Sequence, residues 1–233
     1  MLNALHTRVG LGARRQAGLS LVELMVGVAI GLFVVAGATV VVSNQLGDNR
    51  RLMLEAQIQQ DLRAAADLIS RDLRRAGYWG AAETGVWNAS SVSVASNPYT
   101  QMSAATSGVA ASGVTFAYSR SLAENNFVDA TDQSGFRLDT DGVIRMNTAG
   151  GWQALTDSNT MRVTNFQLKL NQSDVALACF NLCGAAANCP PTQSVREFEI
   201  LIDATAVHDA AVQRSVRSWV RLRNDVVVGA CPA

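Results

Sequence analysis

An uncharged stretch near the N-terminus restricts what this chain can fold into more than any other feature. From Leu24 to Val42 the sequence reads LMVGVAIGLFVVAGATVVV, with neither a charged residue nor a proline. About 19 apolar residues in a helix are enough to cross the hydrocarbon core of a bilayer. We therefore expect this stretch to be a membrane-spanning helix.

The charges on either side of the apolar stretch predict its orientation. Arg14 and Arg15 precede it, whereas Asp48, Arg50 and Arg51 follow it. Because basic residues before a span are retained in the cytoplasm, we expect the N-terminus inside and the rest of the chain outside. A secretory signal fits less well, since its apolar region is shorter and ends in a small-residue cleavage site.

The body of the chain is slightly acidic, although the net charge of the whole chain is zero. The first 18 residues contain Arg8, Arg14 and Arg15 and no acid, which leaves 16 basic against 19 acidic residues in the rest. A body of this charge has no electrostatic reason to bind nucleic acid nonspecifically. We therefore expect no direct nucleic-acid binding.

Glu23 lies at the head of the apolar stretch. A carboxylate inside a bilayer costs several kcal/mol unless it is neutralised or paired. One interpretation places Glu23 among the lipid headgroups, where the cost is small. In the other, the chain is cut after Gly18, and the new α-amino group at Leu19 of one subunit pairs with Glu23 of its neighbour. Such a pair would set the register between subunits, because an unpaired buried charge is strongly penalised.

The segment from Gly18 to Val26 reads GLSLVELMV and resembles the class III signal of type IV prepilins and pseudopilins. The resemblance implies that a prepilin peptidase cuts after Gly18 on the cytoplasmic side and methylates the new first residue, Leu19. It also implies that Glu23 guides subunit docking. The sequence departs from the usual pattern in two ways, because Leu19 stands where Phe is more common and the apolar stretch lacks the helix-loosening proline of many major pilins.

The helical pattern continues beyond the apolar stretch as an amphipathic segment. One face carries apolar residues at spacings of three and four, namely Leu54, Ile58, Leu62, Ala65, Ile69 and Leu73. Arg74 and Arg75 favour the C-terminal end of a helix, and Gly77 predicts its stop. We expect one helix from about Ser20 to Ala76, with a weak point around Gly47.

Beyond Gly77 the apolar pattern changes to the period of two that is typical of strands. The candidates are residues 113–118, 136–139, 143–146, 161–170, 198–202 and 212–222. Thr140-Asp141-Gly142 predicts a hairpin turn, and Glu197 and Glu199 are spaced to face arginines across an antiparallel pair. Residues 86–112 are expected to be exposed loop with a short strand.

These patterns predict an α+β fold in four parts. They are a leader at 1–18, the transmembrane or filament-core half of the helix at 19–45, its amphipathic half at 46–77, and a β-rich globular domain at 78–233. A long N-terminal helix packed on an antiparallel sheet is also the type IV pilin fold that the resemblance implies.

The four cysteines, Cys179, Cys183, Cys189 and Cys231, lie in the last quarter of the chain. An even, clustered set on an exported chain favours disulfides. A zinc site is the competing interpretation, but the spacing Cys-x3-Cys-x5-Cys is not typical of zinc fingers or ribbons. Three pairings are open, and we expect neither a metal nor another cofactor.

No catalytic motif accompanies the one histidine outside the leader, His208, which stands beside Asp209. We expect a solvated or structural histidine and no enzymatic activity, so a membrane-tethered enzyme is the least favoured alternative. The run from Asp139 to Gly142 is similar to the start of a calcium loop but lacks its downstream ligands, which favours a turn.

Two further segments, Asp72–Tyr78 and Trp219–Asn224, resemble PilW-like minor pilins. That resemblance implies a structural subunit of the tip complex that primes type IV pilus assembly and supports adhesion and twitching motility. Its partners would be other minor pilins, the major pilin, the prepilin peptidase, the inner-membrane assembly platform and a tip adhesin. The chain would wait in the inner membrane, with its body in the periplasm, before it joins the pilus tip. A J-type pseudopilin of type II secretion has the same leader and is the nearest alternative.

Overall fold

A single helix, α1 (Leu21–Leu73), occupies the first part of the computed structural model and continues without a break through Gly47. The structure describes residues 18–85, 95–103, 105–121, 123–149, 151–184 and 188–232. Most of the expected leader, residues 1–17, and most of the expected loop, residues 86–94, therefore lie outside the described residues. The chain divides into two compact units, Met1–Asn49 and Arg50–Ala233, and each unit contains part of α1.

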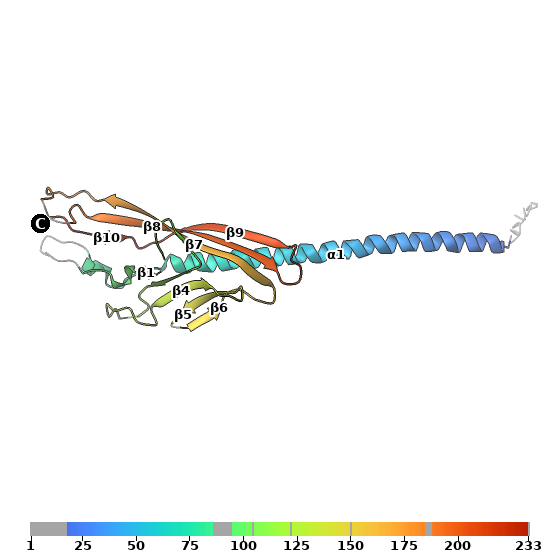
Figure 1. The fold of residues 1–233 in the computed structure, drawn as a ribbon, viewed down its shortest axis with the longest axis horizontal. Coiled ribbons are helices and arrows are strands. Elements are labelled where there is room, and N and C mark those ends of the chain that lie inside the picture. The colour runs from blue at the N-terminus through green and yellow to red at the C-terminus, as the bar shows by residue number, and fades with distance from the viewer. Residues whose placement is uncertain are drawn as a thin grey trace, which may run out of the picture. The chain divides into compact units, whose positions relative to one another are not determined.

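The second unit contains two antiparallel sheets (Figure 1). One has the strand order β1-β3-β4-β5-β6, and the other has the order β10-β8-β7-β2 with β9 also paired to β8. The elements after α1 are η1 (Ala82–Gly85), η2 (Pro98–Thr100), β1 (Met102–Ser103), β2 (Ala110–Ala111), β3 (Gly113–Ala117), β4 (Gln133–Leu138), β5 (Ile144–Thr148), β6 (Gly151–Ala154), β7 (Met161–Ala176), β8 (Thr192–Ala206), β9 (Gln213–Arg221) and β10 (Val226–Val228). The predicted α+β class, one long helix with an antiparallel globular part, is confirmed.

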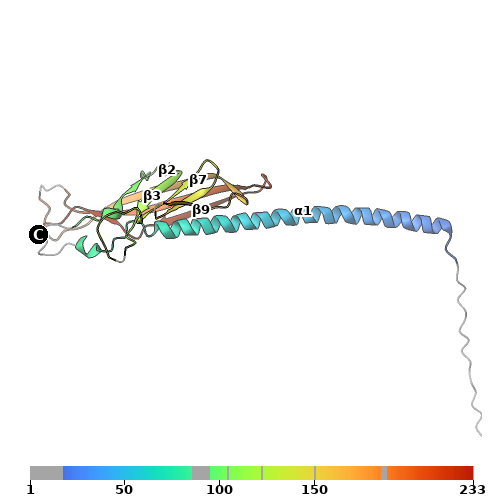
Figure 2. The ribbon, with the colours of Figure 1, turned by 90° about the horizontal axis from the view of Figure 1, so that it is seen from below.

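The second half of α1 packs its apolar face against both sheets, and the strands gather on one side of it (Figure 2). Five of the six residues of the predicted face are buried, namely Ile58, Leu62, Ala65, Ile69 and Leu73. They share one core with Phe136 of β4 and Phe198 of β8, which are both fully buried. Since burying one large apolar side chain contributes about 1.5–3 kcal/mol, this face anchors the body to the helix.

The end of α1 is fixed by a glycine and a carboxylate. Gly77 has a φ of +74°, a left-handed conformation that glycine adopts at little cost, so the predicted stop is confirmed. Asp72 accepts a hydrogen bond of 3.0 Å from the Tyr118 hydroxyl.

Burial and the Asp72 charge raise the pKa of Tyr118 to about 12. The guanidinium groups of Arg75 and Arg120 also lie 4.3 and 4.4 Å from the centre of this ring.

The longest strands, β7 and β8, pair along their whole lengths. Their register shifts between Val163 and Asn165, which explains why the apolar alternation of β7 changes phase there. On the other side of β8, Glu197 lies opposite Arg221, and Glu199 forms an ion pair with Arg217. The predicted facing of acids and arginines is thus confirmed.

The strand that ends the second sheet was not predicted. Sequence periodicity makes residues 212–222 the last strand, but β10 (Val226–Val228) follows and pairs with Thr192–Ser194 of β8. Three consecutive valines carry no alternation, because a strand this short shows no period. The prediction of the last strand was therefore wrong.

Glu124 connects the loop before β4 to the start of the globular body. Its carboxylate accepts hydrogen bonds of 2.8 Å from the Tyr99 hydroxyl, 2.8 Å from the Asn126 amide and 2.9 Å from the Gly80 amide. Burial acts in the opposite direction, but the hydrogen bonds outweigh it and lower the pKa of Glu124 to about 2. Burial and the bond to Glu124 raise the pKa of Tyr99 to about 12.

Replacing Leu62 by alanine should destabilise the second unit by about 2–5 kcal/mol, because the side chain is fully buried between helix and sheet and leaves a cavity. Denaturant unfolding of the full chain in detergent measures the change. Leu68→Ala is the matched control. Because Leu68 is 37% exposed on the same helix, this variant should lose much less free energy of unfolding. Equal losses in the two variants would contradict the assigned core face.

Acid should destabilise the chain partly through Glu124. Because its pKa lies at about 2 in the folded chain and at the model-peptide value of 4.5 when unfolded, its stabilising effect is complete above about pH 4.5 and is lost as the pH falls towards 2. Glu124→Gln should therefore flatten the decline of unfolding free energy between pH 5 and pH 2. A decline as steep as in the parent chain would show that Glu124 is not the titrating group.

Candidate processing and docking site

The predicted cleavage position lies just before the first helix. Residues 18–20 have no regular structure, and α1 begins at Leu21. All three are exposed, and Leu19 exposes 74% of its surface. Exposed, non-helical backbone near a terminus is the usual substrate of a peptidase, so the bond between Gly18 and Leu19 is open to one.

The space around Gly18 would accommodate a larger side chain. A Cβ atom added to Gly18 would meet no heavy atom within 4 Å. Packing within the described chain therefore does not require glycine at this position.

Glu23 lies in the first turn of α1 and is exposed. A negative charge there is favoured by the positive end of the helix dipole. Within the part of the chain that the structure describes, the Glu23 side chain has neither a hydrogen bond nor an ion pair. Its carboxylate therefore has no partner among the described residues, and subunit docking through it stays a prediction.

The helix that starts at Leu21 presents an uncovered apolar surface. Of the described residues, α1 forms the one helix long and apolar enough to cross a membrane, and none of its most apolar segment is buried. Phe33 exposes 82% of its surface, and the exposed apolar residues extend from Leu19 to Val42. Surface of this kind gains about 25 cal/mol for each Å² removed from water, so lipid or other helices must cover it.

Three glycines interrupt this apolar surface. A Cβ atom at Gly27, Gly31 or Gly37 would meet nothing within 4 Å. Each glycine costs a helix interior about 1 kcal/mol relative to alanine, and no contact among the described residues offsets that cost. Small residues let a second helix approach closely, and Gly27 and Gly31 have the GxxxG spacing that does so in membranes.

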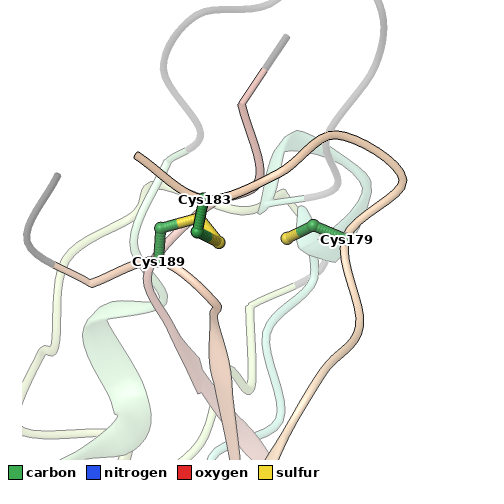
Figure 3. A group of neighbouring side chains, drawn as sticks. All are labelled: Cys179, Cys183 and Cys189. Atoms are coloured by element: carbon green, nitrogen blue, oxygen red, sulfur yellow. A yellow bond between two sulfur atoms is a disulfide. The ribbon is translucent and has the colours of Figure 1, made fainter. Parts of the chain in front are cut away.

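The four cysteines form two disulfides in the second unit. Cys179 pairs with Cys231, 52 residues along the chain, and Cys183 pairs with Cys189, six residues away. Figure 3 shows Cys179 beside the bonded pair of Cys183 and Cys189. The disulfide interpretation is therefore confirmed, and one of its three pairings is selected.

In the hairpin that is similar to a calcium loop, the aspartates are paired with arginines of the same chain. Arg145 forms ion pairs with both Asp139 and Asp141, and Arg137 pairs with Asp139 at 2.7 Å. The hydrogen bond from Arg145 holds the pKa of Asp141 below its usual range. Gly142, with a φ of +79°, closes the turn between β4 and β5. The turn interpretation is confirmed.

His208 belongs to no catalytic group within the described residues. It is exposed in the connection between β8 and β9 and has no hydrogen-bond partner there. The neighbouring Asp209 instead accepts the backbone amide of Ala211 at 3.0 Å, which stabilises the turn. The pair therefore has a structural explanation.

Two families of known proteins match the chain. The family described as prepilin peptidase-dependent protein B matches residues 51–222, which is more than half of the chain. The prokaryotic N-terminal methylation motif matches residues 13–39 and so includes Gly18, Leu19 and Glu23. Comparisons with curated proteins and with solved structures gave no match.

Replacing Gly18 by phenylalanine should leave the longer precursor in the membrane, because a peptidase site that reads glycine has no room for a ring. Mass spectrometry of the purified chain measures the N-terminus. Gly47→Leu is the control, since Gly47 also has open surroundings but lies far from the cut, and it should be processed normally. An unchanged mature N-terminus in Gly18→Phe would contradict the assigned cleavage position.

Proposed function

We propose that this chain, which belongs to the prepilin peptidase-dependent protein B family, is a minor pilin of the type IV pilus that works in the complex priming pilus assembly. In this proposal it is a structural, PilW-like subunit at the pilus tip and catalyses no reaction. Its partners are other minor pilins, the major pilin, the assembly platform of the inner membrane and a tip adhesin. Surface adhesion and twitching motility follow from the pilus that it helps to start.

The proposal rests on the first half of α1, which is apolar and exposed and contains a single charged residue. Between Gly18 and Val42 the one charged residue is Glu23, which has no partner within the described chain. An anchor that only held a body in the membrane would need no carboxylate there, and this carboxylate has a cost in lipid. A filament subunit needs one, because the charge selects one position along the neighbouring helix.

Cleavage supplies the missing positive charge. Hydrolysis after Gly18 gives Leu19 a free α-amino group, which remains cationic at neutral pH when the prepilin peptidase methylates it. Paired across subunits, the Leu19 amine and the Glu23 carboxylate offset each other's desolvation, whereas either group alone in an apolar bundle costs several kcal/mol. Helices that align this pair also bring their exposed apolar faces together.

The disulfides support the proposed location of the body. The arginines before the span favour a cytoplasmic N-terminus, so the second unit lies in the periplasm in this proposal. The cysteine pairs of the second unit require an oxidising compartment to form and persist. Before assembly the chain is a single-pass protein of the inner membrane.

Replacing Glu23 by alanine should leave the chain cleaved and membrane-bound but should reduce its co-purification with partner pilins at least tenfold, because one charge of the docking pair is lost. Crosslinking in cells followed by pull-down measures the association, and electron microscopy counts the pili. Mass spectrometry checks that the N-terminus is still processed.

Two variants separate charge from other effects of the substitution. Glu23→Gln keeps the size of the side chain without its charge and should fail as Glu23→Ala does. Asp67→Ala removes an exposed acid of the same helix without a partner in the described chain and should assemble normally. Normal piliation with Glu23→Ala would refute the charge-pairing mechanism.

A further inference from the structure

The end of α1 and the segment after β9 lie side by side, although they are far apart in the sequence. The Arg223 amide donates a hydrogen bond of 3.3 Å to the Arg74 carbonyl. The Asn224 side-chain amide donates one of 3.0 Å to the carbonyl of Ala76, which lies 148 positions earlier in the chain. Leu222 is buried in the core and fixes this segment to the body. The side chains of Arg74 and Arg223 therefore start from neighbouring points of one surface.

Four exposed arginines gather at this contact and are here named the arginine patch. Arg71 lies in the last turn of α1, Arg74 and Arg75 follow it directly, and Arg223 lies beside them. Residues three and four positions apart share one face of a helix, so Arg71 is on the same side as Arg74 and Arg75. Tyr78, which is 51% exposed, borders the patch, because its amide donates a hydrogen bond of 3.0 Å to the Arg75 carbonyl.

The chain itself neutralises little of the charge of the arginine patch. Within the described residues, Arg71, Arg74 and Arg223 form no ion pair. Arg75 pairs with Asp72 at 3.8 Å, and its side chain is still 59% exposed. Five arginines of the strands, in contrast, form ion pairs with carboxylates of the chain, namely Arg137, Arg145, Arg214, Arg217 and Arg221. The arginine patch is therefore a positive surface on an otherwise slightly acidic body.

The helix dipole explains only part of the arginine patch. Cations are favoured in the last turn of a helix, which accounts for Arg71, Arg74 and Arg75 one at a time. Like charges four positions apart, such as Arg71 and Arg75, nevertheless repel each other and destabilise a helix. Arg223 comes from another segment and adds a fourth positive charge to the same surface. Asp67, four positions before Arg71, is exposed and forms no ion pair within the described chain.

An anionic group of another molecule would relieve this repulsion. A guanidinium presents its N–H donors in a planar fork that matches a carboxylate, and such pairs are frequently bidentate. Arginine and tyrosine are also enriched among the residues that contribute most to protein–protein binding. Aspartate and glutamate side chains of a protein partner therefore fit the arginine patch and the neighbouring Tyr78.

Three other occupants fit the arginine patch less well. A nucleic acid would extend beyond four arginines onto an acidic body, which repels its phosphates. Lipid headgroups are distant, because about 35 Å of helix separates Arg50, which follows the apolar stretch, from Leu73 at 1.5 Å per residue. A second copy in a symmetric dimer would place one arginine patch against another, so that like charges meet.

We propose that the arginine patch binds an acidic surface of a neighbouring pilin subunit. This inference rests on the proposed function, which supplies the class of partner. Glu23 and the arginine patch then have different tasks. Glu23 sets the position of one apolar helix along another, whereas the arginine patch selects the neighbour by the charge of its body. Complementary charges at an interface contribute more to the choice of partner than to affinity.

The test places a photoreactive residue beside the arginine patch in cells that make pili. Tyr78→benzoylphenylalanine keeps an aromatic side chain at an exposed position, and mass spectrometry after illumination identifies the crosslinked peptide. We expect another pilin, crosslinked through a peptide that contains or adjoins aspartate or glutamate. In this background, Arg74→Glu combined with Arg223→Glu should lower the crosslinking yield about tenfold, because attraction becomes repulsion.

Two further variants control for effects other than charge. Arg74→Gln combined with Arg223→Gln removes the charge without reversing it and should lower the yield by a smaller factor. Arg162→Glu makes the same charge change at an exposed arginine of β7 that has no ion pair within the described chain, and it should leave the yield unchanged. Replacing the crosslinked acids of the partner by arginine should restore the crosslink to the chain with Arg74→Glu and Arg223→Glu.

Unchanged yields in both double variants would overturn the proposal, as would a crosslink to nucleic acid, to lipid or to a second copy of this chain. Circular dichroism and mass spectrometry of the N-terminus check folding and processing, and the glutamine variant decides if the glutamate variant misfolds. If the parent chain co-purifies with no pilin, the proposed function fails as well. If pilins co-purify and the double variants crosslink as the parent does, this inference alone fails.

Discussion

The uncovered apolar half of α1 is the constraint on which the rest of the structure depends. No residue of its most apolar segment is buried by the chain's own body, so this surface must be covered by lipid or by other helices. Both environments exclude water, and both penalise an isolated charge. In the proposed function, Glu23 at the head of the segment therefore connects the way the chain is anchored with the way it is assembled.

One helix performs two tasks because its two halves have different surfaces. The first half is apolar on all sides, as a helix in lipid or in a bundle must be, whereas the second half is apolar on one face only. Ile58, Leu62 and Leu73 of that face are buried in the core with Phe136 and Phe198. The division of the chain between Asn49 and Arg50 coincides with this change of surface.

Local patterns predicted much of the fold because many of its features depend on neighbouring residues. The helix, its stop at Gly77 and the hairpin that ends in Gly142 all follow from short stretches of sequence. Glu124 was not predicted, since it bonds groups 25 and 44 positions away, which no local pattern reveals. The cysteine pairing depends equally on distant backbone, because one bridge spans 52 residues.

The candidate site, unlike the fold, was predicted from a resemblance to known proteins rather than from local patterns of residues. The roles predicted for Gly18, Leu19 and Glu23 came from resemblance to prepilin signals, and the match to the N-terminal methylation motif covers these three residues. The structure added the open surroundings of Gly18 and the absence of a partner for Glu23 within the described chain.

The bridge between Cys179 and Cys231 also determines how the body would respond to mechanical load. It ties the segment after β10 to the segment after β7, so the short β10 cannot be peeled from the sheet edge on its own. Tension applied near either cysteine enters both segments through covalent bonds. It then passes into β7 and β8, whose pairing extends from Met161 to Ala176, and through their core side chains into the helix. A body built in this way would transmit a pull along its most extensively bonded strands.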